Sequence, residues 1–447
     1  MKNISLNSFR CFSRLDVTFR PGVNLFVGDN ASGKTSLLSA CKYVISSFFS
    51  GFSTSDTKWL SPKECDFMHL EYAGVVADDL PISISFVCNT DILPPLSNRE
   101  VVKPFDLDKV QVIRKNSAKN SRPLLSGLRD VKNYAESLQL CYLVVDAVSN
   151  VQYHLKPLPL FVSYSTEDIH TSRKIDLDRF CRYAQKRSFG YYLCLEADGL
   201  MKYWMKRLLV LKEAGQMYDE EILVVKNAII SVLGPDGCDI IYDMQVRPNV
   251  GKVFFTLKDG REVESDLLSD GYKRLVSIVV DMAERCSILN RPVFDADAVR
   301  KTKGVVILDE IDLHLHPSLQ SRIVDNLRRT FSGVQFIMST HSPMVMSGVR
   351  NDEDTVVYRM FYNESKRVYE VQEVYPYGMD ISSIAKHILG LPDRTLNVQI
   401  QLDKLMQEID NENYDNAKLL LEQLTQELSP DIKELIEART IINLESE

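Results

Sequence analysis

The chain of 447 residues is 45% hydrophobic and 26% charged, which is the composition of a globular protein, and its length predicts two or three packed lobes. No apolar run approaches the ~18 residues of a membrane span, so we expect no membrane segment. The nine cysteines are scattered without a Cys-x-x-Cys pair, and no signal-peptide pattern is present at the amino terminus, so reduced thiols in the cytoplasm fit best and structural zinc is a remote option.

The formal net charge of −8 is unevenly distributed along the chain. Residues 396–447 hold twelve Asp or Glu and four Lys or Arg, so this segment carries the whole imbalance and the rest of the chain is neutral. An acidic total therefore does not exclude DNA binding by a basic face of the body, but it argues against DNA binding by the tail.

The first third of the chain predicts strands around one helix. Two or three short strands are expected in residues 4–28, and a helix opens immediately after them within residues 33–49. Apolar runs predict further strands at 81–89 and 140–148, and residues 113–122 form a polar, basic loop.

The middle of the chain changes to a helical pattern. Over residues 176–232 several large apolar residues recur at a spacing that fits one helix face, namely Tyr191, Leu195, Trp204, Leu208 and Leu211. We interpret this stretch as a helical insertion, followed by a strand at 240–246, a hairpin at 251–264 with an Asp-Gly turn, and a helix within 267–289.

Strands and helices then alternate toward the carboxyl terminus. Apolar runs predict strands at 304–310, 334–340, 355–362 and 367–374, with a helix at 317–331. Leucines and isoleucines in residues 397–442 predict an antiparallel helical pair and a third helix; they are Leu402, Leu405, Ile409, Leu419, Leu420, Leu424 and Leu428.

Residues 28–35, GDNASGKT, match the phosphate-loop pattern Gly-x-x-x-x-Gly-Lys-Thr between a predicted strand and a predicted helix. In such a loop the backbone amides turn toward phosphate oxygens, Lys34 approaches the β and γ phosphates of ATP, and Thr35 holds Mg²⁺. The expected nucleotide-binding residues are Asn30, Ala31, Ser32, Gly33, Lys34, Thr35 and Ser36. A chance glycine turn is the alternative, and the flanking strand and helix argue against it.

A second apolar strand ends in the adjacent acids Asp309 and Glu310, a costly arrangement unless a cation lies beside them. We assign Asp309 to the metal and Glu310 to the attacking water. A third strand ends in Ser-Thr-His, which places His341 at the same edge of the sheet to sense the γ phosphate or orient water. His314 and His316 alternate like metal ligands, but without a third ligand at zinc spacing we interpret them as turn and packing residues.

A Ser-x-Gly turn at residues 269–271 completes a set of four motifs: GDNASGKT, LLSDGYKR, VVILDEIDLHLHP and STHSP. In this order they resemble the ATPase heads of the ABC superfamily, in the RecF, SMC and OLD-like branch. The resemblance implies an α/β fold, with a mixed sheet flanked by helices, a helical insertion and a carboxyl-terminal helical hairpin. It also implies that Ser269 and Gly271 cap the γ phosphate held by another subunit, and that Arg10 contacts the nucleotide. No glutamine is found in a Q-loop context.

The resemblance also suggests a division of the chain and a set of partners. Residues 1–175 and 236–395 form the two halves of the ATPase head, residues 176–235 the insertion, and residues 396–447 an acidic tail for partner docking or oligomerisation; a solvated hairpin packed on the head is the alternative for the tail. Within the branch the chain is most similar to the PtuA ATPases of Septu anti-phage systems and their retron-linked relatives. That similarity implies ATP and Mg²⁺ as cofactors, a homodimer or higher even-numbered oligomer through the heads, a separate PtuB-like HNH nuclease, and no nuclease domain in this chain.

Two other functions remain open at this stage. One is a RecF-like repair ATPase that binds DNA through a basic track, formed either by Lys202, Lys206, Arg207 and Lys212 or by the loop from Arg114 to Arg122. The other is an ATP-stabilised oligomeric scaffold with vestigial hydrolysis.

Overall fold

The computed structural model describes most of the chain. It covers residues 1–52, 57–68, 71–72, 75–76, 80–89, 106–118, 121, 123–124, 128–143, 156–165, 186–391, 394–429 and 431–445. These residues divide into two compact units, Met1–Ile381 and Ser382–Glu447, which are described separately.

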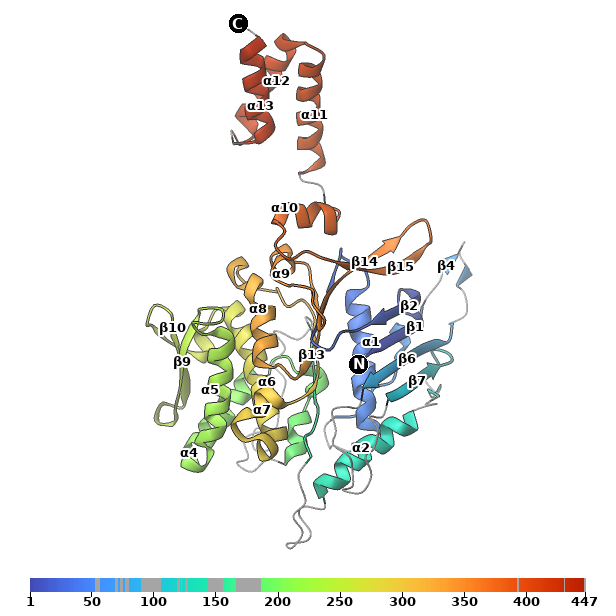
Figure 1. Ribbon diagram of the computed structural model, residues 1–447, viewed down its shortest axis with the longest axis vertical. Coiled ribbons are helices and arrows are strands. Elements are labelled where there is room, and N and C mark those ends of the chain that lie inside the picture. Colours follow the sequence, from blue (N-terminus) through green and yellow to red (C-terminus); the bar gives the residue numbers. More distant parts are fainter. Residues whose placement is uncertain are drawn as a thin grey trace. The chain divides into compact units, whose positions relative to one another are not determined.

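A six-stranded sheet forms the centre of the first unit (Figure 1). In spatial order its strands are β15 (Val368–Val374), β14 (Thr355–Asn363), β3 (Val23–Val27), β13 (Val334–Thr340), β12 (Gly304–Leu308) and β8 (Leu160–Tyr164). All neighbours pair in parallel except β14 with β15. Every residue of β3, β12 and β13 is buried, which explains their continuous apolar sequences. Because β3, β13, β12 and β8 run in the same direction, their carboxyl ends share one edge of the sheet.

A second, antiparallel sheet is built from β2 (Phe12–Thr18), β1 (Asn3–Phe9), β6 (Ile82–Asn89) and β7 (Asp106–Arg114), in that order. Helix α1 (Lys34–Ser46) follows β3, contacts β12 and β13, and lies between strands of the two sheets in Figure 1. Helix α2 (Leu128–Leu143) contacts β7, and the two-residue strands β4 (Glu71–Tyr72) and β5 (Val75–Val76) pair with each other.

A group of helices lies to the left of β13 in Figure 1, and one of them, α6 (Asp270–Phe294), contacts β8. They are α4 (Met201–Glu213), α5 (Asp219–Leu233), α6, α7 (Ala298–Lys301) and α8 (Pro317–Thr330), and the small sheet β9 (Ile241–Arg247), β10 (Lys252–Leu257) and β11 (Glu262–Glu264) contacts α4 and α5. Helix α6 is the most deeply buried, and its Asp281 accepts hydrogen bonds from Tyr164 (2.6 Å), Trp204 (2.6 Å) and Arg285 (2.8 Å). A carboxylate that is 0% exposed needs such partners, so this network fixes α6 to β8 and α4.

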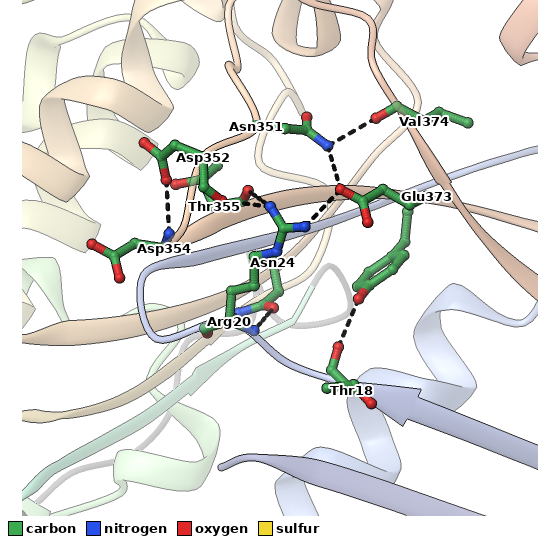
Figure 2. Close-up of polar contacts among 10 residues, drawn as sticks. Thr18, Arg20, Asn24, Asn351, Asp352, Asp354, Thr355, Glu373 and Val374 are labelled. Carbon is green, nitrogen blue, oxygen red and sulfur yellow. Dashed lines mark hydrogen bonds and ion pairs between the residues drawn. The ribbon is translucent and has the colours of Figure 1, made fainter.

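Arg20, in the connection between β2 and β3, ties the edge of the central sheet together (Figure 2). Its guanidinium donates to the carbonyl of Asp352 at 2.5 Å, the carbonyl of Thr355 at 2.8 Å and the carboxylate of Glu373 at 2.7 Å. The backbone N–H of Arg20 donates to Asn24 Oδ1 at 2.7 Å, and Asn24 Nδ2 returns a bond to the carbonyl of Arg20 at 2.9 Å. These contacts set the start of β3, the strand that leads into the phosphate loop, against β14 and β15.

The second unit is a small helical bundle. After α10 (Ile381–Ser383) and a π-helical turn at Ile384–Ile388, it contains α11 (Leu396–Asp410), α12 (Tyr414–Glu427) and α13 (Lys433–Glu445). Its core is formed by Leu402, Leu405, Ile409, Ala417, Leu421, Leu424, Leu435, Ala438 and Ile442. The third helix therefore covers most of the leucine stripe that a hairpin alone would leave open, although Leu419 is 60% exposed. This unit begins at Ser382, earlier than the expected boundary at residue 396.

Most expected elements are confirmed, and one is wrong. Residues 140–143 belong to helix α2 rather than to a strand, while residues 144–148 lie outside the described residues. A short apolar run fits a strand and a buried helix equally well, and the helical spacing begins before it, at Leu128. Within the expected insertion, 3-10 turns at Arg187–Tyr191 and Cys194–Glu196 precede α4 and α5, and all five named apolar residues are buried. Residues 176–185 of the insertion lie outside the described part.

Candidate nucleotide-binding site

Three candidate segments converge at one edge of the central sheet, because each follows a parallel strand. The phosphate loop follows β3, the acid pair follows β12, and His341 follows β13. The register places Thr340 opposite Val27 and Met338 opposite Leu308, so the three strands end side by side. The tertiary structure thus joins motifs that lie as much as 300 residues apart in the sequence.

Backbone geometry forces glycine at two positions of the phosphate loop. Gly28 has φ +147° and Gly33 has φ +93°, both in the region that favours glycine. A Cβ atom at Gly28 would approach the Met360 carbonyl oxygen to 2.2 Å, and one at Gly33 would approach the Phe12 ring to 2.6 Å. Both glycines are therefore required by the fold, and the loop passes tightly between β14 and the β1–β2 turn.

Lys34 is folded back onto its own loop. Its Nζ donates to the carbonyls of Gly28 and Asp29 at 2.8 Å and to Ser32 Oγ at 3.2 Å. Burial lowers the pKa of Lys34 to about 8, and the nearby carboxylates of Asp309 and Asp29 oppose that shift. Phosphate oxygens would compensate this desolvated ammonium better than carbonyl dipoles do. Beside it, Asn30, Ala31 and Thr35 are exposed, Ser32 is buried and Ser36 is half-buried.

The two acids are linked by Ser339, a serine to which the sequence motifs assigned no function. Ser339 Oγ donates to Asp309 Oδ1 at 2.5 Å and accepts from the backbone N–H of Glu310 at 2.8 Å. Asp309 is buried, whereas Glu310 is half-buried with φ +49°, so consecutive carboxylates leave the strand in different environments. One residue further, Thr340 Oγ1 donates to Asp312 at 2.5 Å, which fixes the following loop to β13.

His341 lies within reach of these charges. Its pKa is lowered, first by burial and then by the Lys34 ammonium, while Glu310 and Asp312 act in the opposite direction. The ring is thus favoured in its neutral form, which has one donor and one acceptor nitrogen. His314 is exposed, and His316 Nδ1 caps α8 by accepting from the Ser318 N–H, so both are turn residues as expected.

The residues fit a magnesium ion held mainly by a bound nucleotide. Among the described residues, no three His, Cys, Asp or Glu side chains cluster as a metal site of their own. Mg²⁺ in phosphate sites commonly takes one or two protein oxygens together with phosphate oxygens and water. Thr35 and Asp309 are the side chains at this edge that could supply them.

The Ser-x-Gly turn packs against the loop that follows the acid pair. Ser269 is the N-cap of α6, is exposed, and makes no capping hydrogen bond. A Cβ atom at Gly271 would come within 2.3 Å of the His314 carbonyl oxygen, so α6 approaches that loop more closely than any other residue allows. Arg274, one turn further, donates from Nη2 to the carbonyls of Asp309 and Glu310, both at 2.9 Å.

Arg10 is held at the β1–β2 turn, which contacts the phosphate loop at Gly33. Its Nε donates to Asp66 Oδ1 at 2.8 Å, and Asp66 also accepts from Tyr43 at 2.5 Å and from the Lys63 N–H at 2.7 Å. Asp66 therefore orients a guanidinium that is 29% exposed. Sequence patterns could not reveal this partner, which lies 56 residues away.

Each proposed basic track for DNA contains a base that the structure shows to be paired within the fold. Arg207 is 1% exposed and donates to Glu221 at 2.6 Å, and Lys212 pairs with Asp219 at 2.7 Å. Arg114, the first residue of the other track, is 8% exposed and donates to the carbonyl of Pro62, while Lys119 and Arg122 lie outside the described residues. Arg207, Lys212 and Arg114 are therefore held by partners within the fold, whereas Lys202 is exposed. Gln111, which was not expected to act as a Q-loop glutamine, lies in β7, and its Nε2 donates to Ser83 Oγ at 2.8 Å.

The fold and the site resemble those of AAA/ABC-like ATPases, and two family models match parts of the chain. Residues 155–347 match the family model "AAA domain, putative AbiEii toxin, Type IV TA system", and residues 3–124 match the model "AAA domain". In the part of the chain that the structure describes, no helix has the length and apolarity needed to cross a membrane.

The chain is also similar to particular curated proteins over part of its length. The chain is 41% identical to the Retron Vc95 probable ATPase of Vibrio cholerae serotype O1 biovar El Tor over 106 residues, which is 24% of this chain and 20% of that protein. It is 24% identical to the Septu protein PtuA of Bacillus thuringiensis over 184 residues, covering 38% and 41% of the two chains. A solved SMC head bound to the C-winged helix domain of ScpA has a TM-score of 0.46 at 14% identity, covering 84% of this chain and 97% of that one. The match covers less than half the length of the two curated relatives, the Retron Vc95 probable ATPase and the Septu protein PtuA.

Proposed function

We propose that the chain binds ATP with Mg²⁺ and hydrolyses it slowly, as a regulatory subunit of a bacterial anti-phage defence complex. The observation that carries the catalytic part is the Ser339 bridge, because it fixes Asp309 and Glu310 at the sheet edge where the phosphate loop begins. A bound magnesium ion would neutralise phosphate charge. Side chains of this chain would bind the triphosphate and orient the attacking water.

In this proposal each catalytic group has one task. Lys34 leaves the carbonyls of Gly28 and Asp29 and donates to the β and γ phosphates, as the phosphate-loop lysine does in other NTPases. Glu310 orients the attacking water and accepts its proton, and His341 donates a hydrogen bond to the γ phosphate. Asn30, Ala31, Gly33 and Ser36 line the triphosphate, and Arg10 adds a positive charge beside it.

Ser269 and Gly271 serve the nucleotide of a second subunit. An uncapped, exposed N-cap serine at the start of a 25-residue helix presents backbone N–H groups and a hydroxyl to solvent, which suits an anion arriving from outside the chain. The pocket is then complete only when two heads meet, so ATP favours the dimer and hydrolysis releases it.

Glu310→Gln is the direct test of the catalytic part. The variant should retain ATP binding and dimerise on ATP, while its turnover falls ~10²-fold or more, because a correctly placed amide cannot accept the water's proton. Glu353→Gln, at an exposed position just before β14 and thus at the opposite end of the parallel strands, is the matched control and should keep full turnover. Full turnover by Glu310→Gln would remove Glu310 from the mechanism.

The defence role rests on the similarity to Septu and retron ATPases and extends beyond the catalytic part. We propose that a separate HNH nuclease supplies DNA cleavage and that the acidic helical unit, residues 382–447, docks a partner. Co-purification of the full chain with the product of a neighbouring nuclease gene tests the partnership. Nuclease activity of this chain alone, or a neighbouring gene set without any nuclease, would contradict it.

A further inference from the structure

A cavity of about 450 Å³ lies beside the amino-terminal turn of α6, within the first unit. Its wall is formed by the end of β8, the first turn of α4, the 3-10 turn Ser265–Leu267 and one face of α6. This volume is within the range of small-molecule pockets, roughly 300–1,000 Å³.

The cavity is distinct from the Ser-x-Gly turn, although both involve the start of α6. Asp270, Lys273, Arg274 and Ser277 line it, and their spacing of three, four and seven residues puts them on one face of the helix. Ser269 does not line the cavity, and Gly271 faces the His314 carbonyl instead. A ligand in the cavity would therefore leave the proposed subunit contact free.

Arg274, in the wall of the cavity, has buried hydrogen-bond donors without a partner in the part of the chain that the structure describes. Arg274 is 7% exposed, and its Nη2 donates to the carbonyls of Asp309 and Glu310. Nε and Nη1 are buried and have no hydrogen-bond partner among the described residues. Buried donors of a charged group are costly to leave unpaired, so an acceptor in the cavity would be bound strongly.

The surrounding charges indicate what kind of acceptor fits. Lys202 and Lys273 also line the cavity, and the first turns of α4 and α6 both contribute to it, so one part of the wall favours an anion. Asp198, Asp266 and Asp270 line it too. Asp198 Oδ2 accepts from the backbone N–H of Ser165 at 2.6 Å, and the carboxylates of Asp266 and Asp270 offer oxygens to hydroxyl donors. A purely anionic ligand would leave these acids opposed, whereas a ligand with an anionic end and a hydroxylated body satisfies both.

We propose that this cavity binds a small phosphate monoester with a hydroxylated body, of the sugar-phosphate class. The phosphoryl oxygens accept from Arg274, Lys202 and Lys273, and the hydroxyl groups donate to Asp266 and Asp270. Because the Arg274 guanidinium also holds the carbonyls of the two catalytic acids, occupancy is communicated directly to the sheet edge.

Titration of the full chain with ribose 5-phosphate, followed by isothermal calorimetry, tests the proposal. This probe lacks the β and γ phosphates for which the phosphate loop is built, so binding should be unchanged in Lys34→Ala. Binding should weaken at least 10-fold in Arg274→Met and at least 3-fold in Lys202→Ala. Lys206→Ala, one turn along α4 and outside the cavity wall, is the matched control and should bind like the wild type.

Three results would overturn the assignment. The first is no binding of ribose 5-phosphate at millimolar concentration. The second is binding that disappears in Lys34→Ala, which would place the probe in the phosphate loop. The third is wild-type affinity in Lys202→Ala, a substitution at an exposed position that should not disturb folding and that therefore decides the matter if Arg274→Met proves unstable.

Discussion

Ser339→Ala tests whether one hydroxyl holds Asp309 and Glu310, the two acids of the proposed mechanism, in place. Ser339 is 0% exposed, and its Oγ donates to Asp309 and accepts from the Glu310 N–H. Removing it deprives a buried carboxylate of a donor and a backbone N–H of its acceptor. A hydrogen bond to a charged group contributes ~1.5–3 kcal/mol and a neutral one about 1 kcal/mol, so we expect the free energy of unfolding to fall by about 3 kcal/mol.

The same substitution should also reduce ATP turnover. Without the bridge, Asp309 and Glu310 are no longer fixed to β13, and small displacements of catalytic groups reduce rates by ~10-fold or more. Urea denaturation followed by circular dichroism measures the stability, and phosphate release at saturating ATP and Mg²⁺ measures the turnover.

Ser332→Ala provides the control for this experiment. Ser332 is exposed and its hydroxyl makes one bond, to the Arg300 carbonyl at 3.2 Å, so its loss should change stability by less than ~0.5 kcal/mol. If Ser339→Ala matched Ser332→Ala in both stability and turnover, the bridge would have no role in the site.

Three further predictions concern the phosphate loop, the Ser-x-Gly turn and the helical bundle. Burial lowers the pKa of Lys34 from 10.5 to about 8, so between pH 8 and pH 10.5 the unfolded chain binds more protons than the folded chain. The free energy of unfolding of the wild type, relative to that of Lys34→Met, should therefore rise over this pH range. If urea titrations show that this difference does not change with pH, they contradict the burial of Lys34. Ser269→Ala should change stability by less than ~0.5 kcal/mol yet lower ATP turnover at least ~10-fold, whereas Gly271→Ala should destabilise the fold by ~2 kcal/mol or more through its clash with the His314 carbonyl; equal melting temperatures for these two variants would refute the close approach. Leu405→Ala, at a 0% exposed position, should destabilise the helical bundle by ~2–4 kcal/mol without changing the affinity for ATP in filter binding, and a parallel loss of ATP affinity would show that the two units do not act separately.

Local patterns were sufficient where neighbouring residues alone decide the structure. The phosphate loop at 28–35 is specified by its glycines, its lysine and the buried strand before it, and the structure places all of them as expected. The strands before Asp309 and His341 are continuous apolar runs, so their ends were readable in the sequence. The acid pair and the histidine were therefore predicted as residues of one sheet edge.

Long-range partners were not readable, because they depend on packing and register. Residues 140–143 fit a strand or a helix by pattern, and α2 decided between them. Arg207 has the spacing of an exposed base, yet it lies in the core. There it pairs with Glu221 at 2.6 Å and with the buried Glu284 at 3.6 Å. Burial raises the pKa of Glu284 to about 8, against the influence of Arg207, so this pair is a product of tertiary packing.

The sequence by itself determined which residues are chemically equipped for phosphate and water, since these groups are encoded within short motifs. Only the tertiary structure decided how those groups are held: Ser339 between the two acids, Asp66 behind Arg10, and Arg274 between the acid loop and a cavity. The physical reason is that a motif fixes backbone conformation over a few residues. A buried hydrogen bond between segments 30 or 56 residues apart requires the whole sheet and its helices to be assembled first.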